Sequence, residues 1–223
     1  MDGPHDLGGA PGFGPVRFDP DEPLFDHDWQ RKVFGLTMAT STIGLYNRDE
    51  NRHARERMPA ADYRATGYFE QWLVAMETNL TELGVLDAAT LRARVEEFLA
   101  APDEEVRGKA QPDLFELFRD TLEFGASLDR PVPTPPRYAV GDHVRAVSSA
   151  KPGHTRLPAY VRGHLGVVRR VDPAFVLPDT NAHHEGEHPE HTYNVAFNAH
   201  DLWEKGDHEV RVDVWESYLE PAD

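Results

Sequence analysis

The chain has 223 residues, a formal net charge of −16 and no cysteine. This length is enough for one large domain or two small ones. The acidic balance argues against nucleic acid as a general partner, because non-specific binding to phosphates needs clustered cations. Without cysteine, the chain has no disulfide framework, no thiolate metal site and no cysteine nucleophile.

The N-terminal sequence, Met-Asp-Gly-Pro-His-Asp, lacks the basic and apolar segments of a secretion signal. No apolar run approaches the ~20 residues needed to cross a bilayer. We therefore expect a cytoplasmic protein with no membrane partner. Hydrophobic residues make up only 39% of the chain, so we also expect part of its apolar surface to be buried against a partner.

Residues 1–24 are rich in glycine and proline, and such a segment forms neither a helix nor a central strand. Composition alone favours a disordered tail. The alternative is an extended arm that becomes ordered by wrapping another subunit.

Apolar residues then recur at helical spacing through the region 25–128. Asp26 or Asp28 is placed to cap the first helix, Gly84 to end the third and Asp87 to cap the fourth. The pattern predicts helices near residues 23–43, 48–58, 66–84, 88–101 and 112–124.

The stretch from residue 48 to residue 72 combines cations with aromatic rings. A helix would set Arg48, Arg52 and Arg55 on one face. Guanidinium groups are suited to holding oxyanions, and the aromatic residues that follow would form a wall beside them. The alternative is a solvent-exposed face on which these arginines pair with neighbouring acids, and spacing alone favours it. The aromatic residues are Tyr68, Phe69 and Trp72; the acids are Asp49, Glu50 and Glu56.

A proline-rich stretch at residues 129–136 predicts a stiff linker and a domain boundary. After it, apolar residues alternate with polar ones, which is typical of strands. We expect strands within residues 138–147, 163–171, 193–197 and 210–214, and a 3₁₀ turn in the closing segment 215–219. Four or five short strands indicate a small barrel or sandwich.

Two segments between these strands carry candidate chemistry. Residues 153–156, Gly-His-Thr-Arg, form a turn that would deliver a second guanidinium to a site, or a basic surface loop. Residues 183–191 alternate histidine with glutamate and could bind zinc or nickel, but their loop context favours a polar loop with incidental metal affinity. Its histidines are His183, His184, His188 and His191.

Taken together, these motifs resemble the β subunit of nitrile hydratase, and they match in order along the full chain. The matching motifs are Met-Asp-Gly-Pro-His-Asp-Leu-Gly-Gly-Ala at 1–10 with Gly-Pro at 14–15, Asp-Glu-x-Arg-x-x-x-Glu-x-Met at 49–58, Gly-His-Thr-Arg-x-Pro-x-Tyr-x-Arg-Gly at 153–163, Pro-Asp-Thr at 178–180, Gly-Glu-His-Pro-Glu-His-x-Tyr at 186–193, and Asp-x-Trp-x-x-Tyr-Leu at 213–219.

The resemblance implies an α+β fold: an arm over residues 1–24 that wraps an α subunit, a helical domain over 25–128, a linker at 129–136 and an SH3-like β-barrel over 137–223. It implies an αβ heterodimer that pairs again as α2β2 and hydrates nitriles to amides. The metal, cobalt(III) or iron(III), would be held by cysteines of the α subunit, and no residue of this chain would be a metal ligand.

The resemblance also assigns residues. Arg52 and Arg156 match two arginines that hold oxidised cysteines of the α subunit, and Tyr68 matches a tyrosine that helps place the nucleophile. These three are the expected catalytic residues. The expected substrate-pocket residues are Arg48, Asn51, Trp72 and His154, the last of which matches a histidine near a proton network.

Two positions depart from the family pattern. Asn51 stands where an aromatic residue is expected, and Arg48 stands where leucine is common, so the pocket should be more polar. Gln71 occupies a position that is sometimes histidine. Three other functions stay open on the sequence: a subunit of a thiocyanate hydrolase, an accessory protein that chaperones the α subunit or delivers its metal, and a bare SH3-like binding module.

Overall fold

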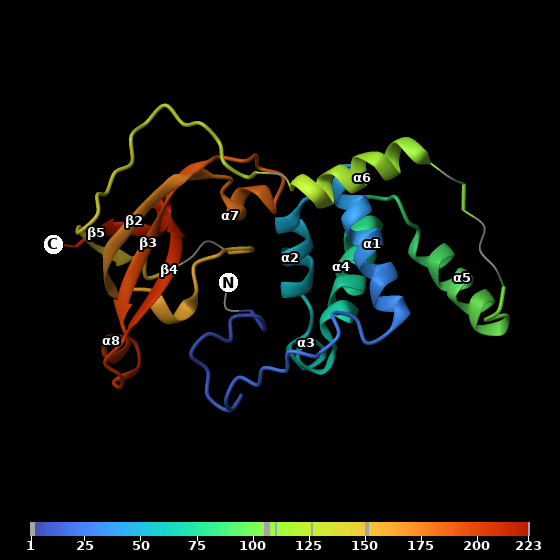
Figure 1. The fold of residues 1–223 in the computed structure, drawn as a ribbon, viewed down its shortest axis with the longest axis horizontal. Helices are drawn as coiled ribbons and strands as arrows, with labels where there is room; N and C mark the ends of the chain where they lie inside the picture. Colours follow the sequence, from blue (N-terminus) through green and yellow to red (C-terminus); the bar gives the residue numbers. More distant parts are fainter. Residues whose placement is uncertain (1–2, 105–107, 110, 126, 150–151, 223) are drawn as a thin grey trace. The chain divides into compact units, whose positions relative to one another are not determined.

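The computed structural model describes residues 3–104, 108–109, 111–125, 127–149 and 152–222. Two compact units make up the chain: Glu22–Ala126, here called the helical unit, and Met1–Asp21 with Ser127–Asp223, here called the sheet unit (Figure 1). Within the described residues, no helix is long and apolar enough to cross a membrane.

All of the predicted helices are confirmed in the helical unit. Asp87 caps the fourth of them as expected, because its carboxylate accepts a hydrogen bond from the Thr90 N–H at 2.8 Å. The first helix begins after His27 instead of after Asp26 or Asp28. A short helix between Pro59 and Gly67 was not predicted. The helices are α1 (Asp28–Thr42), α2 (Arg48–Glu56), α3 (Ala60–Ala65), α4 (Tyr68–Glu82), α5 (Ala88–Ala100) and α6 (Pro112–Phe124).

Helix α4 packs against both α1 and α2. The buried cluster at this centre is small and consists of Tyr46, Met76 and Leu80 with partly buried leucines around it. Neither α5 nor α6 has a buried residue among those described. The helical unit therefore leaves much apolar side-chain area in solvent, most of all along α6, at Leu114, Phe115, Leu117, Leu122 and Phe124.

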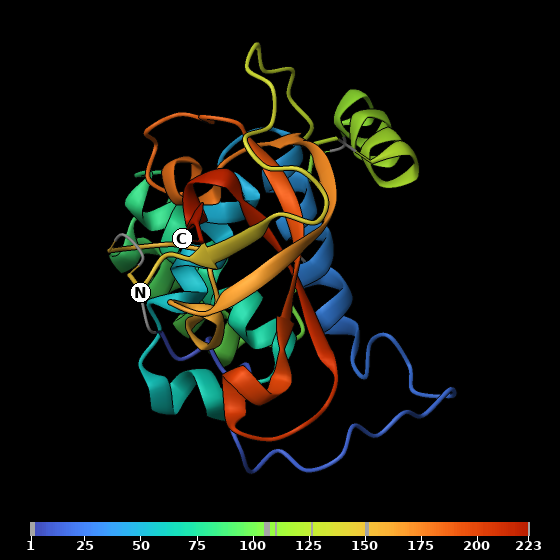
Figure 2. The same cartoon turned by 90° about the vertical axis from the view of Figure 1, so that its left-hand side faces the viewer.

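The sheet unit contains one antiparallel sheet in the order β4-β3-β2-β1-β5. The long strands β2 and β3 lie side by side and curve together (Figure 2). Its strands are β1 (His143–Ala146), β2 (Leu165–Phe175), β3 (Glu190–Asn198), β4 (Glu209–Trp215) and β5 (Leu219–Pro221); its short helices are η1 (Ala159–Val161), α7 (Pro178–Asn181), α8 (Ala199–Trp203) and η2 (Glu216–Tyr218).

These elements confirm an α+β protein with a helical N-terminal half, and they confirm the 3₁₀ turn in the closing segment. They do not confirm the closed SH3-like barrel, because β4 and β5 are edge strands with no pairing between them. Strand β5 has only three residues and ends in Pro221, which lacks an N–H, so it offers few groups to a second neighbour.

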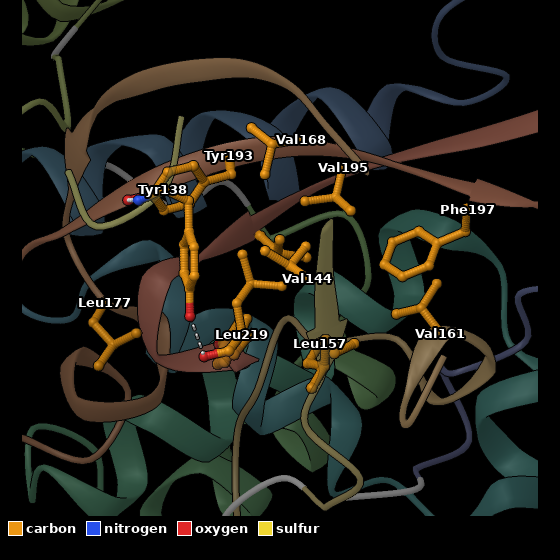
Figure 3. Packing of buried hydrophobic residues seen from close by; sticks show 13 residues of the cluster. Tyr138, Val144, Leu157, Val161, Val168, Leu177, Tyr193, Val195, Phe197 and Leu219 are labelled. Atoms are coloured by element: carbon orange, nitrogen blue, oxygen red, sulfur yellow. Dashed lines mark hydrogen bonds between the residues drawn. The ribbon is translucent and has the colours of Figure 1, made fainter. Parts of the chain in front are cut away.

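The core of the sheet unit is larger than that of the helical unit (Figure 3). Valines from β1, β2, β3 and β4 fill it, and Tyr138 closes one end, where its hydroxyl donates to the Leu219 carbonyl at 3.2 Å. The Tyr193 hydroxyl accepts from the Arg137 N–H at 2.9 Å and donates to Glu216. Burial and the bond to Glu216 raise the pKa of Tyr193 to about 12, so this phenol stays protonated at neutral pH.

The proline-rich stretch is attached to the sheet unit along its length. The Arg130 N–H donates to the Ala174 carbonyl at 2.8 Å, and its guanidinium binds both carboxylate oxygens of Glu187 at 2.6 and 2.7 Å. The Thr134 carbonyl lies 2.8 Å from His191 Nε2. Apart from an isolated β-bridge between Asp129 and Phe175, the stretch has no regular secondary structure, and these bonds fix its path.

The segment around Asp6 and Gly8 is also attached, whereas composition favoured a disordered tail. The Asp6 carboxylate accepts from the Ala159 N–H at 3.0 and 3.3 Å and lies 3.6 Å from the Arg162 guanidinium. Gly8 lies so close to the Tyr160 ring that a Cβ atom would reach within 2.5 Å of it. Beyond this contact the segment exposes large apolar side chains at Phe13, Val16 and Phe18.

The same substitution at two glycines should have opposite effects on stability. A Cβ atom at Gly166 in β2 would lie 2.5 Å from Val195 Cγ1 and 3.0 Å from the Ala196 oxygen, whereas at Gly35 in α1 it would meet nothing within 4 Å. We expect Gly166→Ala to lower the free energy of unfolding by about 1–3 kcal/mol. We expect Gly35→Ala to raise it by roughly 0.5–1 kcal/mol. Urea unfolding of both purified variants measures the difference, and equal shifts would contradict the packing described for β2.

Candidate functional site

Helix α2 begins with a complete capping box. The Asn47 side chain accepts from the N–H groups of Asp49 and Glu50, both at 2.9 Å. The Glu50 carboxylate accepts in return from the Asn47 N–H at 2.7 Å. These bonds satisfy the open N–H groups of the first turn and set two carboxylates at the positive end of the helix dipole. The start of α2, which carries the first candidate residues, is thereby fixed.

Arg52 is held by an acid of the same turn. One of its terminal nitrogens lies 3.2 Å from Asp49 Oδ1; the side chain of Asp49 is 6% exposed and that of Arg52 is 32% exposed. The buried carboxylate anchors the guanidinium while leaving part of it accessible. This is one of the acid pairs that the solvent-face interpretation predicted. Arg48, one turn earlier, is exposed.

The predicted aromatic wall forms at the start of α4. The Tyr68 ring lies 5.3 Å from that of Phe69 and 5.5 Å from that of Trp72, measured between centroids. Phe34 of α1 stacks on Trp72 at 6.0 Å. Tyr68 remains 61% exposed on this unit.

Arg55 contacts the aromatic residues, whereas the sequence analysis only grouped it with Arg48 and Arg52 on one helix face. Its guanidinium carbon is 5.9 Å from the centroid of the Trp72 ring, within the range of a cation–π contact. Burial lowers the pKa of Arg55. Arg55 thus helps orient Trp72 between α2 and α4.

Asn51 is buried and faces a polar cluster of the helical unit. It lies beside the Tyr46 hydroxyl, which also accepts a hydrogen bond from Thr40 Oγ at 2.8 Å. Burial raises the pKa of Tyr46, and these polar neighbours oppose that effect. Gln71 is buried as well and donates to the Tyr63 carbonyl at 2.8 Å. The Gln71 amide is therefore engaged within its own unit, whereas Asn51 Nδ2 is buried without a hydrogen-bond partner among the described residues.

In the sheet unit, the loop at residues 153–157 presents one exposed arginine between buried neighbours. His154 is 0% exposed, Thr155 5% and Leu157 1%, whereas Arg156 is exposed. Gly153 begins the loop with φ +103°, and the His183 ring occupies the place where a Cβ would lie, so only glycine fits there. Arm residues 5–8 border a cavity of about 210 Å³ opposite residues 155–158 and 160. Among the described residues, no hydrogen bond or ion pair engages the Arg156 guanidinium.

A buried network lies directly behind this loop. The Tyr218 hydroxyl accepts from the Arg156 N–H at 3.2 Å and from Thr155 Oγ at 3.3 Å, and it donates to the Asp179 carboxylate. Burial raises the pKa of Asp179, and the hydrogen bond from Tyr218 opposes that effect. Sequence reasoning assigned no role to Tyr218 or Asp179, although both stand in motifs that carry the family resemblance.

The histidine-rich segment makes backbone contacts. His183 Nδ1 lies 2.7 Å from the Asp179 carbonyl, His188 Nε2 lies 2.8 Å from the Glu185 carbonyl, and His191 reaches Thr134. Each of these three rings has a hydrogen-bonding role within the sheet unit.

The expected site residues divide between the units. The helical unit carries Arg48, Asn51 and Arg52 on α2 and brings Tyr68 and Trp72 together on α4, which packs against α2. The sheet unit supplies His154 and Arg156 on a single loop.

Two family models match the chain: nitrile hydratase beta subunit, N-terminal, at residues 1–114, and nitrile hydratase beta subunit, C-terminal, at residues 127–221. A low-molecular weight cobalt-containing nitrile hydratase subunit beta from Rhodococcus rhodochrous is 41% identical, with full coverage of both chains. A nitrile hydratase subunit beta from Pseudomonas putida is 38% identical over the full length of both. A cobalt-containing nitrile hydratase subunit beta from Pseudonocardia thermophila is 34% identical, covering all of this chain and 97% of the relative.

The chain is thus an α+β protein with candidate residues on two units, and the relatives it matches are enzyme subunits. It belongs to the nitrile hydratase β-subunit family.

Proposed function

We propose that this chain is the β subunit of a metal-dependent nitrile hydratase, which hydrates nitriles to amides together with an α subunit that carries the metal. The observation that carries the proposal is the match to nitrile hydratase β subunits along the whole chain, at 41% identity to one of them. Retention of Arg52 and Arg156, one in each matched half, adds to it.

The chemistry of this chain fits a metal held elsewhere. It has no cysteine, and its candidate residues include guanidiniums, which donate hydrogen bonds and do not ligate cations. Cobalt(III) or iron(III) in the α subunit would supply a Lewis acid for the nitrile. Arg52 and Arg156 would hold the oxidised cysteine oxygens of that subunit, for which permanent positive charge and fork geometry suit them. The exposed guanidinium of Arg156 and the anchored, part-exposed one of Arg52 support this role.

The remaining candidates would place substrate and nucleophile. Tyr68 is exposed and has a hydroxyl that can hydrogen-bond a reactant, and Trp72 behind it supplies an apolar wall. His154 is buried beside Asp179, so we assign it to a proton network and not to direct contact with substrate.

The exposed apolar residues of the chain support a large partner interface. They lie on the segment after residue 10 and along α6, and several exposed large apolar side chains on one segment favour an interaction site. We assign them to the α subunit, with residues 1–24 wrapping it, and we expect the αβ heterodimer to pair into α2β2 in the cytoplasm.

For the sheet unit we keep the SH3-like classification as a proposal. The strand order β4-β3-β2-β1-β5 and the 3₁₀ turn η2 between β4 and β5 support it.

Thiocyanate hydrolase is less well supported as the function. A thiocyanate hydrolase apo-enzyme structure from Thiobacillus thioparus is 27% identical, with a TM-score of 0.38, covering 40% of this chain and 78% of its own. That likeness is confined to part of the chain, whereas the nitrile hydratase β subunits match its whole length. Full-length matches of this kind also weigh against an accessory protein or a bare SH3-like module.

The first experiment is an amide-formation assay with acrylonitrile. We expect activity from this chain co-expressed with its α subunit and activator, and none from this chain alone. Metal analysis of the same complex would identify cobalt or iron. A metal-loaded complex that forms no amide would contradict the proposed reaction and favour thiocyanate or another polar substrate.

Lysine substitutions test the two arginines. Arg52→Lys and Arg156→Lys keep the charge but lose the fork geometry, so we expect kcat to fall by about 10²-fold with the complex still formed. Arg57→Lys and Arg169→Lys are matched controls, because these arginines form exposed pairs with Glu82 and Glu209. The controls should keep near-normal kcat; near-normal turnover in either test variant would remove that arginine from the proposed role.

The polar residues at 48 and 51 predict substrate preference. We expect kcat/KM for small polar nitriles to exceed that for bulky aromatic ones, because a polar pocket gains little from apolar burial. Kinetics of the complex over a panel of nitriles measure this. A preference of about tenfold for the aromatic substrates would refute it.

A further inference from the structure

We propose that Tyr218 and Asp179 are positioning residues for Arg156, and that their buried hydrogen bond fixes the loop from which Arg156 reaches the active site. The inference rests on the proposed function, because Arg156 has a task only if the chain works as a nitrile hydratase β subunit.

The loop has the features of a rigid support for one side chain. Three of its four residues from 154 to 157 are buried, so their positions are set by packing, and only Arg156 points outward. The close fit of Gly153 against His183 fixes one end of the loop. At the other end, Asp6 accepts from the first N–H of η1 and so holds the turn that follows Pro158.

The Tyr218 hydroxyl uses its whole hydrogen-bonding capacity on this loop and on Asp179. A phenol has one proton to donate and two lone pairs to accept with. The proton goes to Asp179, and the lone pairs receive the Arg156 N–H and Thr155 Oγ. The backbone of Arg156 is therefore bonded directly to a side chain that is 5% exposed.

Charge strengthens this arrangement. A hydrogen bond to an ionised carboxylate is roughly twice as strong as a neutral one, and low local polarity adds to it. Burial, followed by the Asp179 charge, raises the pKa of Tyr218, so the hydroxyl keeps its proton and remains the donor. Asp179 comes from α7 and Tyr218 from η2, so two elements of the sheet unit converge on the loop.

The functional consequence follows from the geometry that a guanidinium needs. A fork that binds two oxygens loses its second bond when it tilts, and displacements of about 1 Å can lower a rate by 10²-fold. A buried network that restrains the backbone of Arg156 therefore supports kcat without touching substrate.

Tyr218→Phe in the assembled, metal-loaded complex tests this. We expect kcat to fall by about tenfold and KM to stay within about twofold, because orientation is lost and the pocket is not. Tyr138→Phe is the matched control: it removes another buried tyrosine hydroxyl from the same core, and that hydroxyl donates to the Leu219 carbonyl (Figure 3) and not to the loop at residues 154–157. It should lower the melting temperature comparably and leave kcat unchanged. Equal kcat in the two variants would overturn the proposal.

A double variant separates positioning from a general structural effect. If Tyr218 acts through Arg156, then Arg156→Lys with Tyr218→Phe should be no slower than Arg156→Lys alone. Multiplicative losses would overturn the proposal. Normal kcat in Arg156→Lys alone would contradict the role that the proposed function gives to Arg156. The positioning role of Tyr218 would then be contradicted as well.

Thr155 provides a second variant pair should Tyr218→Phe not assemble. Thr155→Val keeps the side-chain shape but removes the hydroxyl that donates to Tyr218, and we expect kcat to fall by about threefold. Thr155→Ser keeps the hydroxyl and should restore normal kcat. Equal kcat in both Thr155 variants would contradict the positioning role.

Discussion

The sheet unit is organised around the hydrogen bonds of the Tyr218 hydroxyl, because its bonds to Asp179, Thr155 and the Arg156 N–H join three segments that are far apart in sequence. Tyr218 contributes its ring to the hydrophobic core and its hydroxyl to the polar network. Removing one partner of such a bond would leave a buried polar group unsatisfied, which destabilises a protein more than the bond itself stabilises it. The same bonds order the loop that carries Arg156, so stability and function share one constraint.

The helical unit is organised differently. Its fully buried cluster has three residues, while its aromatic rings and its long apolar side chains on α6 stay near or at the surface. A small core of this kind gives little stabilisation from apolar burial alone. The capping box of α2 and the bidentate bond between Arg57 and Glu82 supplement it. The unit is thus suited to acquire further buried area from a partner, as expected of one half of a complex.

The sequence predicted those elements whose signal lies within a few neighbouring residues. The helix capped by Asp87 and the 3₁₀ turn before Leu219 were predicted correctly, because capping and short-range periodicity act over a few residues. The short elements α3, α7 and α8 have four to six residues and no room for a periodic pattern. Composition wrongly favoured disorder for residues 3–10. Asp6 holds this segment by binding Ala159 and Arg162, which lie more than 150 residues away in the sequence and leave no local signal.

The candidate residues follow the same rule. The arginine face and aromatic wall of residues 48–72 could be read from spacing, and family resemblance paired Arg52 with Arg156. The hydrogen bonds that hold the Arg156 backbone could not be predicted from the sequence. Tyr218 and Asp179 are 39 residues apart, and neither residue alone indicates that they bond. A flexible side chain has a defined reach only when its Cα is fixed, and the buried Tyr218 hydroxyl that accepts from the Arg156 N–H holds that part of the backbone. Under the proposed role of Arg156, the tyrosine of the closing Asp-x-Trp-x-x-Tyr motif acts by holding the backbone of a residue 62 positions earlier in the chain.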